Sequence, residues 1–297
     1  MKKLICTLLF FIFILPVYIL ANDVIIVEDS SNNISQKIIS SFVKNVNGNY
    51  RIIKKSENNS NYIIKTIKTN VPELVIALGD DSAGLIKDAV NGQNIRVIVA
   101  LVNNERKLID NENIFGVVNR VNCQQVFNNI KRFFPEIKAV GIFKSVDSNY
   151  FVDSLKSCNK KEGLFILDYS VTDMKDLNNQ LLTTFPSFDL FYLQRDSLLL
   201  NKYFIKSLVI KSVLYNRPII TYSEKLLNLG AVLAITVDYS DVGNKMSLLA
   251  NTILKKKTPV SRFIFPRSKV YFNKKIAKKL NINIPDSALK NVVIIGE

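Results

Sequence analysis

The sequence predicts an α/β protein of two lobes, each built on a Rossmann-like, doubly wound sheet. Three observations support this class. Short apolar runs that end in polar clusters alternate with segments of helical periodicity. The alternation then restarts in the second half of the chain, which indicates two similar lobes. Finally, 297 residues with 48% hydrophobic content can supply two cores.

The first copy of the alternation begins with continuous apolar runs, which are typical of strands buried on both faces of a parallel sheet. Strands are predicted at 24–27, 50–53, 74–78, 96–102 and 114–118. Helical periodicity is found at 34–43, 62–67 and 83–90. These βαβ units should have right-handed crossovers.

The second copy opens with a helix at 124–133. Strands are predicted at 139–143, 164–169, 190–193, 219–222 and 232–237, with helices near 176–182, 198–214 and 223–229. A last helix has Val242, Met246 and Leu249 on one face, and Ser240 or Asp241 is a reasonable N-cap.

The first 21 residues have the pattern of a signal peptide. Lys2 and Lys3 precede an apolar run at 4–20, and Ala21 is a small residue at a cleavage site. The alternative is an uncleaved anchor, because the run is just long enough to span a bilayer. Cys6 lies too early for a lipoprotein site, so we expect a free periplasmic protein.

The net charge of +15 raises the question of nucleic-acid binding. The lysines, however, are scattered pairs at helix ends and in loops rather than a patch interleaved with aromatic residues. We therefore predict no nucleic-acid partner.

Two cysteines, Cys123 and Cys158, remain after cleavage of the signal peptide. An exported pair could form a disulfide. Two cysteines alone are weak evidence for a bridge, and we expect two buried apolar thiols instead.

The chain has no histidine, which removes Ser-His and Cys-His nucleophilic sites and most transition-metal sites. It also lacks the C-x-x-C, G-x-G-x-x-G and P-loop patterns. A carboxylate-only enzyme that uses two of Asp80, Asp81, Asp196 and Asp238 is an alternative, but we predict a protein that is not an enzyme, with no metal and no cofactor.

Polar residues follow the predicted strands at their carboxyl ends, where ligands bind in open α/β sheets. These candidate ligand contacts are Asp29, Ser30, Asn103, Ser145, Tyr222, Ser223 and Asp238. Asp238 could instead orient a hinge.

Several segments resemble one protein family. LGAVLAITVDY at 229–239, followed by Asp241-Val242-Gly243, is similar to a segment of the periplasmic solute-binding proteins of ABC importers for tryptophan, tyrosine and related solutes. Further similar segments are ELVIALG at 73–79, FGV at 115–117, Phe134-Pro135 before Val140-Gly141-Ile142, Phe188-Asp189 through Asp196-Ser197, and Phe272-Asn273 through Ala288.

The resemblance implies a type I periplasmic-binding-protein-like fold in which the chain crosses between lobes near residues 119, 238 and 257. Lobe one would then hold 22–119 and 239–257, and lobe two 120–238 and 258–297. A hinge of this kind allows closure on a small organic solute such as an amino acid. The implied partners are an ABC permease and ATPase, and we expect a monomer.

An amino acid needs donors for its carboxylate and an acceptor for its ammonium. Gly79 and the amides of Asp81, Ser82 and Ala83 at a helix start are our candidate for the carboxylate, although Asp80, Asp81 and Ser82 could merely cap that helix. The family usually has threonine and an apolar residue here, and two acidic side chains would repel a ligand carboxylate.

Asp196 is our candidate partner for the ammonium group, with an N-cap as the alternative role. The preceding Arg195 stands where the family usually has proline, and it would suit an anionic group. These departures support a rival hypothesis of an exported sensory module that signals to a membrane partner.

Overall fold

The computed structural model describes residues 23–103, 108, 110–159 and 163–296. The predicted signal peptide at 1–21 lies outside the described residues. Within them, no helix is both long and apolar enough to cross a membrane.

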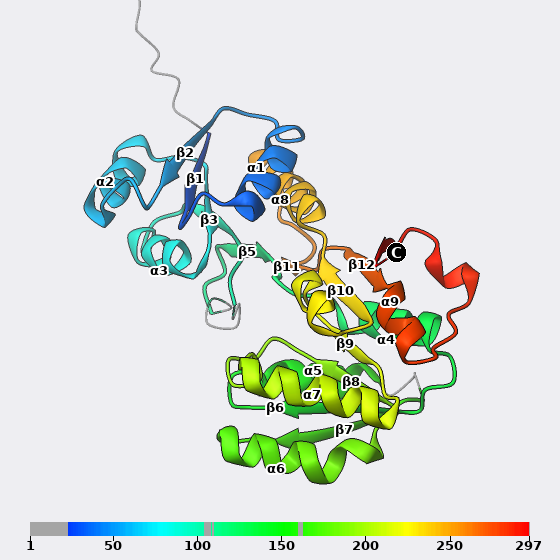
Figure 1. The fold of residues 1–297 in the computed structure, drawn as a ribbon. Coiled ribbons are helices and arrows are strands. Elements are labelled where there is room, and N and C mark those ends of the chain that lie inside the picture. The colour runs from blue at the N-terminus through cyan, green and yellow to red at the C-terminus, as the bar shows by residue number, and fades with distance from the viewer. Residues whose placement is uncertain (1–22, 104–107, 109, 160–162, 297) are drawn as a thin grey trace, which may run out of the picture.

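The first sheet has six parallel strands in the order β11-β5-β4-β3-β1-β2 (Figure 1). They are β1 (Val24–Glu28), β2 (Tyr50–Lys54), β3 (Leu74–Leu78), β4 (Arg96–Ala100), β5 (Ile114–Val117) and β11 (Phe263–Ile264). One face packs against α1 (Asn33–Val43) and α8 (Tyr239–Leu254). The other packs against α2 (Ser60–Asn70) and α3 (Asp80–Ala89).

The second sheet has seven strands in the order β13-β12-β10-β9-β8-β6-β7, and only β12 and β10 pair antiparallel. The strands are β6 (Ala139–Lys144), β7 (Phe165–Ser170), β8 (Leu190–Leu193), β9 (Ile219–Thr221), β10 (Leu233–Val237), β12 (Ser268–Asn273) and β13 (Val293–Ile295). Two α/β sheets confirm the predicted fold class.

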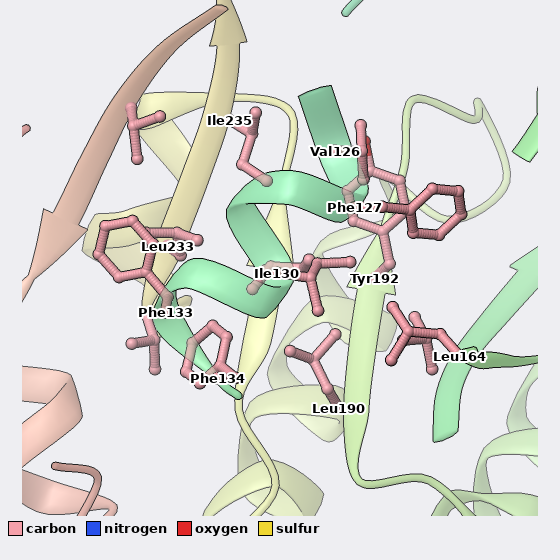
Figure 2. Close-up of a cluster of buried hydrophobic side chains, with 14 of the residues drawn as sticks. Val126, Phe127, Ile130, Phe133, Phe134, Leu164, Leu190, Tyr192, Leu233 and Ile235 are labelled. Atoms are coloured by element: carbon pink, nitrogen blue, oxygen red, sulfur yellow. The ribbon is translucent and has the colours of Figure 1, made fainter. Parts of the chain in front are cut away.

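Helices cover both faces of the second sheet. On one face lie α4 (Cys123–Phe133), α5 (Asn149–Cys158), α9 (Lys274–Lys279) and the short η5 (Asp286–Leu289). On the other lie α6 (Met174–Thr184), α7 (Lys202–Tyr215), η3 (Phe185–Ser187) and η4 (Glu224–Leu229). Figure 2 shows the first of these cores, where Phe127, Ile130 and Phe133 of α4 pack onto Tyr192, Leu233 and Ile235 of the sheet.

The chain passes between the two sheets after β5, after β10 and between β11 and β12. We assigned residues from 258 onward to lobe two, but β11 pairs with β5, so residues 263–264 belong to the first sheet. The backbone amides of Gly116 and Val118 donate to the carbonyls of Arg262 and Ile264, at 2.8 and 2.9 Å. A strand of two residues has no periodicity to detect, and β11 is defined only by the sheet edge that it extends.

The two cysteines form a disulfide, which corrects our expectation of two free thiols. Cys123 begins α4 and Cys158 ends α5, and their Cα atoms lie 6.2 Å apart. The two helices pack against each other on the same face of the sheet, and this brings together cysteines that are 35 residues apart.

Candidate functional site

The carboxyl ends of β1 and β3 form a closed network rather than an open anion site. Asp29, which follows β1, turns its carboxylate onto the start of α3. Its Oδ2 accepts from the amide of Asp81 at 3.1 Å, and its Oδ1 accepts from the amide of Ser82 at 2.7 Å and from the Ser82 hydroxyl. The Ala83 amide donates to the Gly79 carbonyl at 3.1 Å. All three amides that we expected to hold a ligand carboxylate therefore have partners, and one of these is a carboxylate of the protein itself.

Gly79 permits this arrangement. Its φ of +116° lies in a region that side chains rarely adopt, and a Cβ here would lie 2.0 Å from Oδ2 of Asp29. The glycine therefore provides space for a protein carboxylate rather than for a ligand.

Replacing Gly79 with alanine should lower the free energy of unfolding by about 2 kcal/mol, because the new methyl group is strained and displaces the carboxylate that caps α3. Urea denaturation measures the change, with Gly84→Ala as control because a Cβ there would have no atom within 4 Å other than those of its chain neighbours and its own helix backbone. Equal stability of Gly79→Ala and the wild type would contradict the proposed packing of Asp29.

The two acidic residues after Gly79 are also engaged. Asp80 accepts from the backbone amide of Asn103 at 3.0 Å and from its side-chain amide. Asp81 pairs with Lys55 at 3.0 Å. The Ser30 hydroxyl accepts from the Asn32 side chain, which caps α1, at 3.1 Å. The structure thus joins Asp29 to Asp81 and Ser82 and Asp80 to Asn103, and it gives the Asp81 and Ser30 side chains other partners within the protein.

In the second sheet, Asp196 has the role that Asp29 has in the first, and the residue is only 2% exposed. Its Oδ2 accepts from the amide and hydroxyl of Ser145, at 3.0 and 2.8 Å, and from the Ser148 hydroxyl. Its Oδ1 accepts from the amides of Leu198 and Leu199, at 2.9 and 3.4 Å. Asp196 therefore joins the loops after β6 and β8, and it does not offer a free acceptor to a ligand ammonium.

These hydrogen bonds also set the charge of Asp196. Burial alone raises the pKa of a carboxyl group, but the bonds from Ser148, Ser145 and Leu198 outweigh burial and lower the pKa of Asp196 below its usual range. The group is an anion fully satisfied by the protein.

Arg195 differs from the aspartates. Its side chain is exposed, and no hydrogen bond or ion pair to it is found among the described residues. Burial raises the pKa of Tyr222 and of Tyr239, and the positive charge of Arg195 opposes both increases. The three residues follow the carboxyl ends of β8, β9 and β10, which are neighbouring strands of the second sheet. We call Arg195, Tyr222 and Tyr239 the Arg195 cluster.

Glu224 and Tyr271 border this cluster. Burial and a hydrogen bond to Glu224 raise the pKa of Tyr271 to about 12. The negative charge of Glu224 also makes a small contribution to the raised pKa of Tyr239. Ser223 is half-buried beside Tyr222. Sequence reasoning missed Glu224 and Tyr271 as site residues. Glu224 could have been suspected because it lies just after a predicted strand, whereas no sequence pattern pointed to Tyr271.

Asp238 lies at the crossing between β10 and α8. Its side chain caps α8 by accepting from the Ser240 amide at 3.1 Å, and its backbone amide donates to the Arg267 carbonyl at 2.9 Å. Asp241, 5% exposed, accepts from the backbone amide of Arg267 at 2.7 Å and from its Nε at 3.0 Å. Both aspartates bind the neighbouring crossing, which fits the hinge alternative for Asp238.

Among the described residues, no cluster of three or more acidic or cysteine side chains is placed to hold a metal ion. What the site offers a ligand is one exposed guanidinium beside two half-buried aromatic rings.

Comparison with known proteins gives a family and a set of similar structures. The sequence model of a family described as "ABC transporter substrate binding protein" matches residues 34–293. A search of curated proteins gives no match.

Three solved structures are similar to this chain. One is the ligand-free, open structure of a substrate-binding protein with adhesive properties from Clostridium difficile, at 17% identity over 92% of this chain and 98% of that one, with a TM-score of 0.72. Another is an ABC domain from Streptococcus pneumonia in complex with L-Trp, at 20% identity over 92% and 100%, with a TM-score of 0.58. The third is a conserved domain protein from Vibrio cholerae, at 17% identity over 91% and 98%, with a TM-score of 0.58. At these identities the likeness shows the fold alone.

Proposed function

Because the chain belongs to the family of ABC transporter substrate-binding proteins, we propose that it is the exported solute receptor of an ABC importer and binds a small organic solute that carries a carboxylate. Its fold is of the type I periplasmic-binding-protein-like class. The observation that carries the ligand chemistry is the exposed guanidinium of Arg195, which has no hydrogen bond or ion pair in the described part of the chain and whose charge acts on Tyr222 and Tyr239.

The network of Asp29 supports an anion site in the second sheet rather than the first. The helix start that would attract a ligand carboxylate in lobe one already holds the carboxylate of Asp29. A second carboxylate there would meet like charges and occupied donors. Arg195 can instead form a bidentate, charge-assisted pair with a ligand carboxylate.

The two tyrosines favour a flat or apolar ligand body. Tyr222 and Tyr239 are half-buried, and each phenol lies near the Arg195 charge. A ring or hydrocarbon part can stack on them while its carboxylate reaches the guanidinium. An aromatic amino acid or a related aromatic acid fits this arrangement.

Capture of the ligand needs no covalent chemistry. A solute that contacts both lobes stabilises the closed form by as much as its affinity for that form exceeds its affinity for the open one. The closed, loaded protein would then be recognised by a permease and an ATPase at the membrane.

We expect isothermal titration calorimetry of the protein lacking residues 1–21 to detect binding of at least one aromatic amino acid or aromatic acid. Each ligand is paired with its carboxamide, which keeps the ring but lacks the negative charge. Flat titrations with a folded sample, or equal affinity for acid and amide, would refute the proposal.

The Arg195→Gln variant should bind the carboxylate ligand about tenfold more weakly, because one charge-assisted pair is lost. Its affinity for the carboxamide should not change. Arg51→Gln is the matched control, since its guanidinium donates to the Tyr62 hydroxyl, 2.9 Å away, beside α2. An unchanged affinity of Arg195→Gln for the acid would place the anion elsewhere.

Export can be tested separately. Because residues 2–21 have the pattern of a signal peptide, we expect the mature protein to begin at Asn22. N-terminal sequencing of the protein released from cells by osmotic shock checks this, and an intact Met1 in the membrane fraction would support an uncleaved anchor.

A further inference from the structure

The last residue of β1, Glu28, has a buried carboxylate, one oxygen of which has no hydrogen-bond partner among the described residues. The residue is 2% exposed, and the oxygen is Oε2. Glu28 shares the α1 face of the first sheet with Val24 and Ile26, whereas the next residue, Asp29, caps α3. A buried carboxylate without a hydrogen bond or a counter-ion is costly, and such groups in native proteins have a specific cause.

Glu28 lines a hollow of about 480 Å³ that is open to solvent. Its walls come from Ile39 and Ser40 of α1, from Ile52 and Lys54 of β2, and from Asn58 in the loop that follows. Ile52 is 39% exposed and lies on β2, the edge strand of the first sheet. The hollow therefore combines one buried anion with aliphatic walls and amide or hydroxyl groups.

The neighbouring Lys54 forms its ion pair with Glu57, and the charge of Glu28 adds only a smaller contribution to the raised pKa of Lys54. Lys54 lies opposite Glu28 in the β1–β2 register, but its ammonium pairs with Glu57 at 2.9 Å. The hollow thus contains two carboxylates and one ammonium, although the whole chain carries a net charge of +15. This local excess of negative charge favours a cation.

We propose that this hollow binds a small primary alkylammonium, with the ammonium on Glu28 and the hydrocarbon chain between Ile39 and Ile52. An ammonium supplies three donors, one for the Glu28 oxygen and two for nearby oxygens such as those of Ser40 and Asn58. A Ca²⁺ or Mg²⁺ ion prefers a cluster of carboxylates, and no group of three or more acidic side chains among the described residues is placed to hold a metal ion. This site is separate from the Arg195 cluster and does not depend on the proposed transport function.

Calorimetry with n-pentylammonium chloride tests the proposal on the protein lacking residues 1–21. We expect saturable binding, with no binding of 1-pentanol or of pentanoate, because only the ammonium matches the carboxylate. Glu28→Gln should weaken binding at least tenfold. Lys54→Gln should strengthen it, since a competing positive charge is removed.

Two control variants test whether alkylammonium binds at Glu28 rather than at another carboxylate or at the Arg195 cluster. Glu73→Gln removes an exposed carboxylate of the same lobe and should leave the affinity unchanged, and so should Arg195→Gln. Binding that is insensitive to Glu28→Gln, or the absence of saturable binding to the wild type, overturns the proposal whatever ligand the Arg195 cluster takes.

The fold of the key variant is checked by thermal unfolding. Because Glu28→Gln removes an unpaired buried charge and keeps the side-chain shape, it should melt at or above the wild-type temperature. A clearly lower melting temperature would show that the protein itself satisfies Glu28, which would also overturn the proposal.

Discussion

Replacing both Cys123 and Cys158 with alanine is expected to lower the free energy of unfolding by about 4 kcal/mol. The disulfide closes a loop of 35 residues, and the chain-entropy relation for such a loop gives a loss of this size. The bridge joins the start of α4 to the end of α5, both of which lie on the core shown in Figure 2. Because the bridge acts mainly on the unfolded chain, the folded protein should keep its ligand affinity.

Guanidinium denaturation of the double variant measures this loss, with the wild type under reducing conditions as its counterpart. The reduced wild type and the double variant should unfold at the same midpoint, below that of the oxidised protein. Identical midpoints for oxidised and reduced wild type would show that the bridge makes no contribution. The unfolding free energy of the oxidised protein should also depend less steeply on guanidinium concentration, because a cross-linked unfolded chain exposes less surface.

How far the fold could be predicted depends on the kind of element. Strands β1 and β3 are continuous apolar runs, buried on both faces, and they were found from sequence alone. By contrast β13, whose residues Val293 and Ile294 are more than a third exposed, and the two-residue β11 carry no comparable pattern. Their existence depends on a free sheet edge, which only the folded chain provides.

The site was predictable as a location but not as a set of contacts. The rule that ligands bind at the carboxyl ends of strands selected Asp29, Asp196 and Arg195, which lie in the loops after β1 and β8. Whether a carboxylate faces solvent or turns back onto a helix start depends on how two loops approach each other. That approach joins residues about fifty positions apart, as in Asp29 with Ser82 and Asp196 with Ser145.

Those two aspartates follow one physical design in both lobes. Each follows a strand closely, crosses to the loop of a neighbouring strand and binds backbone amides and a serine hydroxyl there. Each fixes the relative position of two loops at the carboxyl edge of its sheet. The two carboxylates therefore act as internal supports, whereas Arg195 has no internal partner among the described residues.

The Asp196→Asn variant is expected to lose about 3 kcal/mol of unfolding free energy at pH 7. The substitution keeps the shape of the side chain but removes the charge, and its NH₂ group faces donors that previously bound Oδ2 or Oδ1. Chemical denaturation checks this, with Asp88→Asn as a control, because Asp88 is exposed and no hydrogen bond or ion pair to it is found in the described part of the chain.

The difference between the wild type and Asp196→Asn should also depend on pH. The pKa of Asp196 in the folded protein is lowered, because the hydrogen bonds from Ser148, Ser145 and Leu198 outweigh burial. A carboxyl group with a lowered folded pKa contributes stability that is complete above its unfolded pKa of about 3.9 and is lost as pH falls through the folded value. The stability gap should therefore be constant between about pH 7 and pH 5 and should shrink below about pH 4. A gap that widens with acidification would mean that Asp196 is protonated in the folded protein, and the two loops would then be held by a neutral group.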